Sequence, residues 1–195
     1  MLQFITNTES KYSVAEQVQM FTEAGGMWIQ MSVSRNNPDL KDEVRQIMEI
    51  VSGEDSFLII DHDVELVNEM KVHGVHLSPG DMLPSEAREL LGPHAVIGVT
   101  VKTAAEVIAL KKADIDYVQI GPYPEVGIED YSRIVGEVRA AGVEIPIVAT
   151  GEISIDSIPG IMASGVSGIA MSRIPLESED PVEYFRKAIE ILVSR

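Results

Sequence analysis

The sequence has no cysteine, no long apolar run and little positive charge, and each absence excludes a class of protein. Without cysteine the chain forms no disulfide and offers no thiolate, which fits a reducing compartment, so we expect a cytoplasmic protein. No apolar run reaches the roughly 18 residues of a membrane-spanning helix, so we expect no membrane contact. The N-terminal MLQFITNTES lacks a basic stretch followed by an apolar one, so we expect no signal peptide.

Acidic residues outnumber basic residues by 31 to 15, which gives a formal net charge of −16 at pH 7. A negative field of this size repels polyanions, and the sequence has no basic patch interleaved with aromatics, so nucleic acid is not an expected partner. The P-loop, G-x-G-x-x-G, HExxH and serine-elbow motifs are also missing. A phosphate site would have to be made locally positive against the overall charge.

What the sequence does contain is a regular alternation of two kinds of segment. Short apolar runs, mostly rich in β-branched residues, are typical of buried strands, and the stretches between them have the amphipathic pattern of helices. In the seventh of these helices Pro159 predicts a late start or a kink. The eight predicted strands span residues 2–6, 27–31, 57–60, 74–77, 95–100, 116–121, 145–150 and 167–171.

Strands that alternate with helices predict a parallel sheet, and eight such units predict a closed (β/α)8 barrel, or TIM barrel. A doubly wound open sheet is the structural alternative. The 195 residues fit a single α/β domain that covers positions 1–195. Because the active sites of such barrels lie at the C-terminal ends of the strands, polar residues at those ends are the functional candidates.

The densest polar cluster is the stretch Asp61, His62 and Asp63, directly after the third predicted strand. Two carboxylates and a histidine cannot all be buried without partners. One interpretation is a solvated turn in which Asp61 caps the next helix. The other is a metal site or an acid–base site shared with Asp81. Oxygen ligands suit Mg²⁺, whereas a histidine ligand favours a transition metal.

His76 lies inside the fourth predicted strand, in GVHLSPGD. It is either a core histidine with satisfied hydrogen bonds or, like His62, a general acid or base, because histidine titrates near neutral pH. The sequence leaves both interpretations open.

The last two strand ends, ATGEIS and AMSR, are where barrel enzymes often bind phosphate. Gly151 allows a close backbone approach, and Arg173 supplies a charged planar fork of donors. Glu152 opposes this interpretation, because a carboxylate beside a phosphate dianion weakens binding unless it points away.

Three stretches carry a resemblance to a known family: LIIDHDVELVNEMKVHGVHLSPGDM, VIGVTVKTAAEVIALKKADIDYVQIGP and IPIVATGEISIDSIPGIMASGVSGIAMS. With weaker similarity between them, nearly the whole chain resembles the thiamine phosphate synthase family, which includes the thiazole tautomerases. The resemblance implies a (β/α)8 barrel. A synthase couples a thiazole phosphate to an aminopyrimidine diphosphate with Mg²⁺ and releases pyrophosphate, whereas a tautomerase only moves protons on the thiazole carboxylate phosphate.

The resemblance also implies roles for particular residues, with small phosphorylated heterocycles as ligands. For the assembly, a homodimer is one option. His76 and His62 are the catalytic candidates, and Asp61 and Asp81 are the Mg²⁺ candidates. The substrate-binding candidates are Gln30 toward the pyrimidine, Thr100 in the pocket, Gly121 of the G-P string, and Gly151 with Ser172 or Arg173 on the phosphate.

The chain departs from the synthase pattern where the pattern binds diphosphate. Ser32 and Ser34 stand in place of the arginine and lysine of Q-L-R-E-K, and Asp61, His62 and Asp63 stand in place of N-D-R. YPEVGIED lacks the lysine and threonines of a T-x-T-K-like stretch, and Glu152 replaces a glycine of the G-G-I turn.

Three expected cations are thus missing, and three carboxylates lie nearby in sequence: Asp63, Glu125 and Glu152. Each lost charge-assisted contact is worth roughly 1.5–3 kcal/mol, so we expect weakened coupling, offset in part by Arg35 and Lys102. Three hypotheses follow: a synthase, a tautomerase that uses His62 or His76 as acid and base, and a barrel that binds thiazole phosphate without catalysis.

Overall fold

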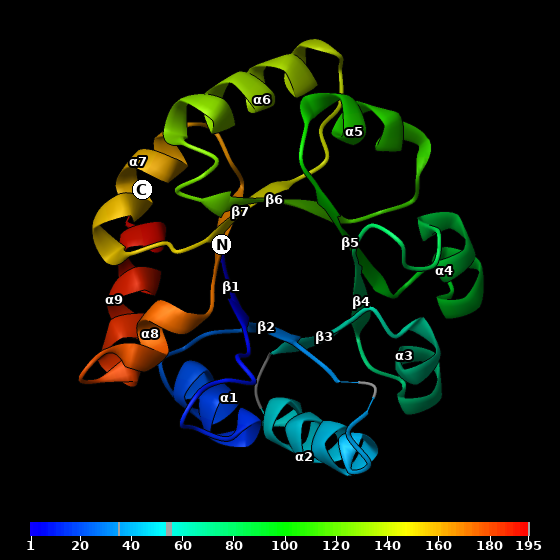
Figure 1. Ribbon diagram of the computed structural model, residues 1–195, viewed down its shortest axis with the longest axis vertical. Helices are drawn as coiled ribbons and strands as arrows, with labels where there is room; N and C mark the ends of the chain where they lie inside the picture. The colour runs from blue at the N-terminus through cyan, green and yellow to red at the C-terminus, as the bar shows by residue number, and fades with distance from the viewer. Residues whose placement is uncertain (35, 54–55, 195) are drawn as a thin grey trace.

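The computed structural model describes residues 1–34, 36–53 and 56–194 and contains a closed barrel of parallel strands. The strands pair in chain order and β1 pairs with β8, so the open-sheet alternative is wrong. Figure 1 shows the strands as an inner ring with the helices outside it. The strands are β1 (Leu2–Ile5), β2 (Trp28–Met31), β3 (Phe57–Asp61), β4 (Gly74–Leu77), β5 (Val96–Val101), β6 (Tyr117–Tyr123), β7 (Ile147–Gly151) and β8 (Gly168–Met171).

A helix follows each strand, as the alternation predicts, and β8 is followed by two. The helices are α1 (Val14–Glu23), α2 (Leu40–Ser52), α3 (Val64–Met70), α4 (Pro84–Leu91), α5 (Ala104–Ala109), α6 (Ile128–Ala140), α7 (Ile158–Ala163), α8 (Arg173–Glu177) and α9 (Pro181–Val193), with 3-10 turns η1 (Leu110–Lys112) and η2 (Ile155–Ser157). Pro159 lies in the first turn of α7, so the predicted late start is confirmed. The short α8 was not predicted.

The helices pack on the outside of the barrel through their apolar faces. Phe21 of α1 and Phe185 of α9 contact Phe4 of β1, with ring centroids 5.3 and 4.9 Å from that of Phe4. All three rings are fully buried. This aromatic cluster joins the first and last parts of the chain across the closing edge of the barrel.

A small apolar cluster, separate from the main core, joins side chains from several strands. Tyr117, Val148 and Ala170 are buried in this cluster and pack against Ile5, Trp28 and Val96. The rings of Trp28 and Tyr117 meet edge to face, with centroids 4.9 Å apart. The Tyr117 side chain also contacts the polar groups of the barrel through its hydroxyl, which lies 3.0 Å from Nδ1 of His76.

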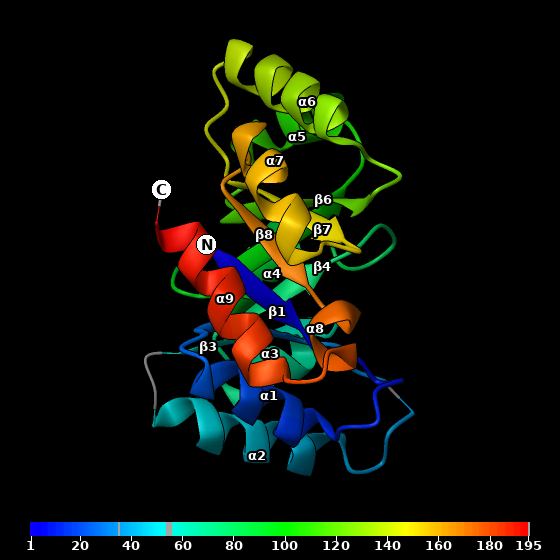
Figure 2. The ribbon, with the colours of Figure 1, turned by 90° about the vertical axis from the view of Figure 1, so that its left-hand side faces the viewer.

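The two ends of the barrel are distinct in the side view. In Figure 2 the N-terminus and the end of α9 lie on one side, whereas α8, which follows the carboxyl end of β8, lies on the other. Among the described residues, no helix is long and apolar enough to cross a membrane.

Candidate active site

Asp61 ends β3 as a buried carboxylate, only 8% exposed. Its Oδ1 accepts a hydrogen bond from Gln30 Nε2 at 2.6 Å, and its Oδ2 accepts one from Ser32 Oγ at 3.0 Å. Burial raises the pKa of Asp61 above its ordinary value, and the nearby charge of Asp81 adds to the rise. The hydrogen bonds from Ser32 and Gln30 lower the pKa and oppose this rise in part. Asp61 is therefore an acid whose charge would be stabilised by a cation.

The structure brings His62 and Asp81 together, as the shared-site interpretation predicts. His62 has a backbone φ of +66°, and its N–H donates to the carbonyl of His76 at 2.9 Å. Its Nδ1 lies 2.6 Å from Asp81 Oδ2, and the same oxygen accepts the backbone N–H of Ser78 at 2.7 Å. The loop after β4 thus orients Asp81, and Asp81 orients the imidazole of His62.

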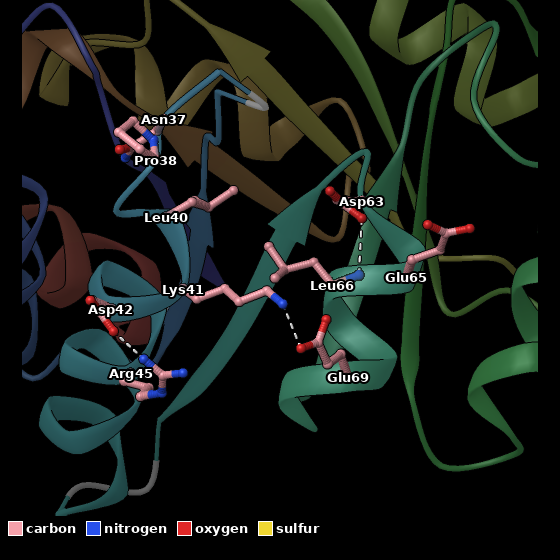
Figure 3. Close-up of a pocket in the computed structure, with 10 residues that line it drawn as sticks. All are labelled: Asn37, Pro38, Leu40, Lys41, Asp42, Arg45, Asp63, Glu65, Leu66 and Glu69. Atoms are coloured by element: carbon pink, nitrogen blue, oxygen red, sulfur yellow. Dashed lines mark hydrogen bonds and ion pairs between the residues drawn. The ribbon is translucent and has the colours of Figure 1, made fainter.

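Asp63 has a different role, because it caps α3. Its side chain accepts a hydrogen bond from the backbone N–H of Leu66 at 2.9 Å (Figure 3), so the interpretation in which Asp61 is the cap is wrong. Asp63 also borders a cavity of about 560 Å³ between α2 and α3. The cations that line this cavity are already paired, Lys41 with Glu69 and Arg45 with Asp42 (Figure 3).

His76 is buried inside the barrel, with 2% of its surface exposed. Its Nε2 lies 2.7 Å from Thr100 Oγ1, and its Nδ1 lies 3.0 Å from the Tyr117 hydroxyl. Burial lowers the pKa of His76 to about 3. The imidazole is therefore neutral at neutral pH and can orient a group by hydrogen bonding, but it carries no charge.

Three glutamines form a hydrogen-bonded layer beside His76 and Asp61. Gln30 Oε1 accepts from Gln3 Nε2 at 2.9 Å and from Gln119 Nε2 at 2.7 Å. Gln3 also donates to the Tyr117 hydroxyl at 3.1 Å. Sequence reasoning found Gln30 but missed Gln3, Gln119 and Tyr117. The available signal was a glutamine inside an otherwise apolar run, since a buried amide needs partners.

At the ends of β6 and β7, two glycines allow the strands to approach closely. A Cβ on Gly121 would lie 2.4 Å from the carbonyl oxygen of Thr150, and a Cβ on Gly151 would lie 2.3 Å from the nitrogen of Tyr123. Gly151 also has a φ of +127°. The backbone N–H of Glu152 donates to the carbonyl of Tyr123 at 2.8 Å. Strand packing alone explains both glycines, and the prediction that they contact phosphate stays a prediction.

Arg173 begins α8, directly after Ser172, and is held by two carboxylates. Its Nη2 lies 2.6 Å from Glu152 Oε2, and its Nη1 lies 2.8 Å from Glu177 Oε2. Glu152 therefore points toward Arg173. Arg173 and Glu177 also line a cavity of about 400 Å³ together with Asn7, Glu9, Ser10, Lys11 and Leu176.

Two further cavities border the strand ends. One of about 410 Å³ is lined by His62 and Asp81, and one of about 330 Å³ is lined by Thr100. Of the two cations expected to compensate for the missing ones, Lys102 is exposed just after β5, and Arg35 lies outside the described residues.

A closed (β/α)8 barrel with buried polar groups at the carboxyl ends of its strands defines the class of protein, a barrel enzyme. The chain matches the model of the thiamine monophosphate synthase family over residues 2–174. It is 37% identical to the thiamine-phosphate synthase of Bacteroides fragilis, with 97% of this chain and 98% of that protein covered. It is 35% identical to the protein of the same name from Bacteroides thetaiotaomicron, with 97% and 96% covered.

A solved structure named as a thiamine phosphate pyrophosphorylase of Pyrococcus furiosus superimposes with a TM-score of 0.88 at 27% identity. The superposition covers 99% of this chain and 95% of that chain. The chain belongs to the thiamine monophosphate synthase family.

Proposed function

We propose that the chain is a thiamine-phosphate synthase, which couples a thiazole phosphate to an aminopyrimidine diphosphate. The observation that carries the proposal is the near full-length similarity to relatives of that name, at 37% identity over 97% of the chain. In the reaction a bond forms between the thiazole and the diphosphate-bearing carbon of the pyrimidine, and the bond from that carbon to the diphosphate oxygen breaks. The site must therefore orient two rings and stabilise the negative charge that leaves with pyrophosphate.

Gln30, His76 and Thr100 are the proposed contacts for the pyrimidine and its pocket. They belong to one hydrogen-bonded system that also contains Tyr117 and Asp61, so their positions are coupled. Because burial lowers the pKa of His76 to about 3, we assign it the role of a neutral hydrogen-bonding group. The network holds these side chains before substrate arrives, which lowers the entropy lost on binding.

Asp61 and Asp81 are the proposed ligands for Mg²⁺. Their oxygen donors fit a hard cation. Burial and the charge of Asp81 disfavour the charged form of Asp61, and a cation beside the two carboxylates would stabilise that form. Within the described parts of the chain, no group of three or more ligand-type side chains is arranged to hold a metal, so diphosphate oxygens and water would complete the shell. Bound Mg²⁺ would neutralise charge on the departing pyrophosphate. His62 shares Asp81 and would lie beside the metal.

For the thiazole phosphate we propose the ends of β7 and β8, with Gly151 and either Ser172 or Arg173 as contacts. Arg173 also lines a cavity of about 400 Å³ between α8 and the loop after β1, and Lys11 is a second cation on the wall of that cavity. We also propose that residues 1–195 form one domain and that the protein functions in the cytoplasm. For the assembly we propose a homodimer, and light scattering on the purified protein would measure its mass.

A second candidate function is proton transfer of the thiazole-tautomerase kind. The contact of 2.6 Å between His62 and Asp81 favours it, because an oriented imidazole at a strand end suits general acid–base work. This reaction needs no diphosphate site, so the missing cations do not weaken it. If His62→Gln left tautomerisation unchanged, the assignment of His62 as the acid and base would be wrong; the low pKa of His76 excludes it from that role.

The test of the synthase is a coupling assay on the purified chain. Thiazole phosphate, aminopyrimidine diphosphate and Mg²⁺ are mixed with the protein, and thiamine phosphate is measured by chromatography alongside released pyrophosphate. We expect equal amounts of the two products and loss of both with Asp81→Asn. The absence of thiamine phosphate above the enzyme-free background would rule out this activity; binding of thiazole phosphate without turnover would point to a binding barrel.

A further inference from the structure

We propose that Glu152 sets the affinity of the barrel for the phosphate of its substrate by competing with that phosphate for Arg173. The inference rests on the proposed function, because it assumes that a phosphate binds between the ends of β7 and β8. To bind Arg173, the phosphate of the substrate must displace the carboxylate of Glu152.

The contacts of the guanidinium carry the argument. Glu152 faces the edge formed by Nε and Nη2 of Arg173, at 3.4 and 2.6 Å, and Glu177 faces Nη1, at 3.0 and 2.8 Å. The edge with Nε and Nη2 is a two-donor fork of the kind that binds carboxylate or phosphate in a bidentate manner. Glu177 lies one turn along the same helix and binds Nη1, so it does not occupy the edge formed by Nε and Nη2. Either Glu152 or a phosphate can bind that edge.

Two backbone donors of the turn after β7 are already in use. The backbone N–H of Glu152 donates to Tyr123, and that of Ile153 donates to the carbonyl of Gly151 at 2.9 Å. A phosphate therefore depends more on side-chain cations here than on the amides of this turn. Two cations, Arg173 and Lys11, and two carboxylates, Glu9 and Glu177, line the neighbouring cavity. The carboxylate of Glu152, paired with Arg173, therefore makes the local net charge negative.

The solvent exposure of the ion pair limits how much Glu152 can weaken phosphate binding. The side chains of Arg173 and Glu152 are 50% and 47% exposed, so water and salt screen their attraction. Exposed ion pairs contribute modestly, and removing such a competitor corresponds to roughly two- to fivefold tighter binding. The gain should shrink as salt is added, and it should apply only to the phosphorylated ligand.

The test is calorimetric binding of thiazole phosphate and of the unphosphorylated thiazole alcohol to the full chain at low and high salt. We expect Glu152→Gln to bind thiazole phosphate roughly two- to fivefold more tightly than wild type at low salt and to bind the alcohol unchanged. Glu183→Gln is the matched control, because Glu183 pairs with Arg186 at 2.7 Å on α9 and its loss removes the same charge elsewhere. It should bind like wild type.

A second variant makes the test specific to Arg173. In an Arg173→Gln background, Glu152→Gln should give no gain, because the contested cation is absent. An unchanged or weaker affinity of Glu152→Gln, an equal gain for the alcohol, or a gain that persists without Arg173 would each overturn the inference. If wild type makes thiamine phosphate in the coupling assay and Glu152→Gln binds no more tightly, the inference fails alone; if no variant binds thiazole phosphate, the proposed function fails with it.

Discussion

Replacing His76 with glutamine should change how the stability of the protein depends on pH. The buried imidazole has a pKa of about 3 in the folded chain, against an ordinary value of 6.5. At pH 5 the unfolded chain therefore binds a proton at His76 that the folded chain does not. Since the unfolded state binds more protons, the free energy of unfolding falls as the pH drops below 6.5.

The magnitude follows from the two pKa values. From pH 8 to pH 5 the unfolded histidine gains nearly one proton, which lowers the free energy of unfolding by about 2 kcal/mol, at 1.36 kcal/mol per pH unit below 6.5. The loss grows to about 4 kcal/mol at pH 3, where the folded histidine is itself half protonated. His73 acts in the same direction, because burial lowers its pKa, but it is present in both proteins and cancels from the comparison.

The assay is urea unfolding followed by circular dichroism at pH 8 and pH 5. Wild type should lose about 2 kcal/mol more than His76→Gln between the two pH values, even if the variant is less stable at both. His94→Gln replaces an exposed histidine and should keep the wild-type dependence. An equal pH dependence in wild type and His76→Gln would refute the assignment of His76 as a buried neutral imidazole.

Two further predictions concern Asp61 and Gly151. Asp61→Asn should lower kcat/KM for coupling at least about tenfold and weaken its dependence on Mg²⁺, measured from initial rates across an Mg²⁺ titration; an unchanged Mg²⁺ dependence would contradict the metal role. Gly151→Ala should lower the free energy of unfolding by roughly 1–3 kcal/mol, because its Cβ would meet Tyr123 and its φ is positive. The matched Gly136→Ala in α6 has open space and should stabilise by about 0.5–1 kcal/mol in the same denaturation assay; equal effects of the two substitutions would contradict the close-approach argument.

The barrel was predictable because its strands are buried on both faces. Continuous apolar runs then coincide with strands, as at residues 57–60, which lie within β3. The short α8 was missed because its residues, RIPLE, make only about one turn and carry no helix periodicity.

Only those contacts of the site that join residues after adjacent strands were predictable from the sequence. His62 and Asp81 follow adjacent strands, so the fold alone brings their loops together. The hydrogen bond between Gln3 and Gln119 joins residues 116 positions apart, and only closure of the ring makes them neighbours. The pairing of Arg173 with Glu152 likewise depends on side-chain directions that residue types do not determine.

A crystal structure of the chain with thiazole phosphate bound would test the proposed binding site most directly. We expect the phosphate between the carboxyl ends of β7 and β8, beside Arg173, with the thiazole ring directed toward His76 and Asp61. A ligand bound instead in the apolar cavity at the opposite end of the barrel, beside Met27 and Phe57, would contradict it.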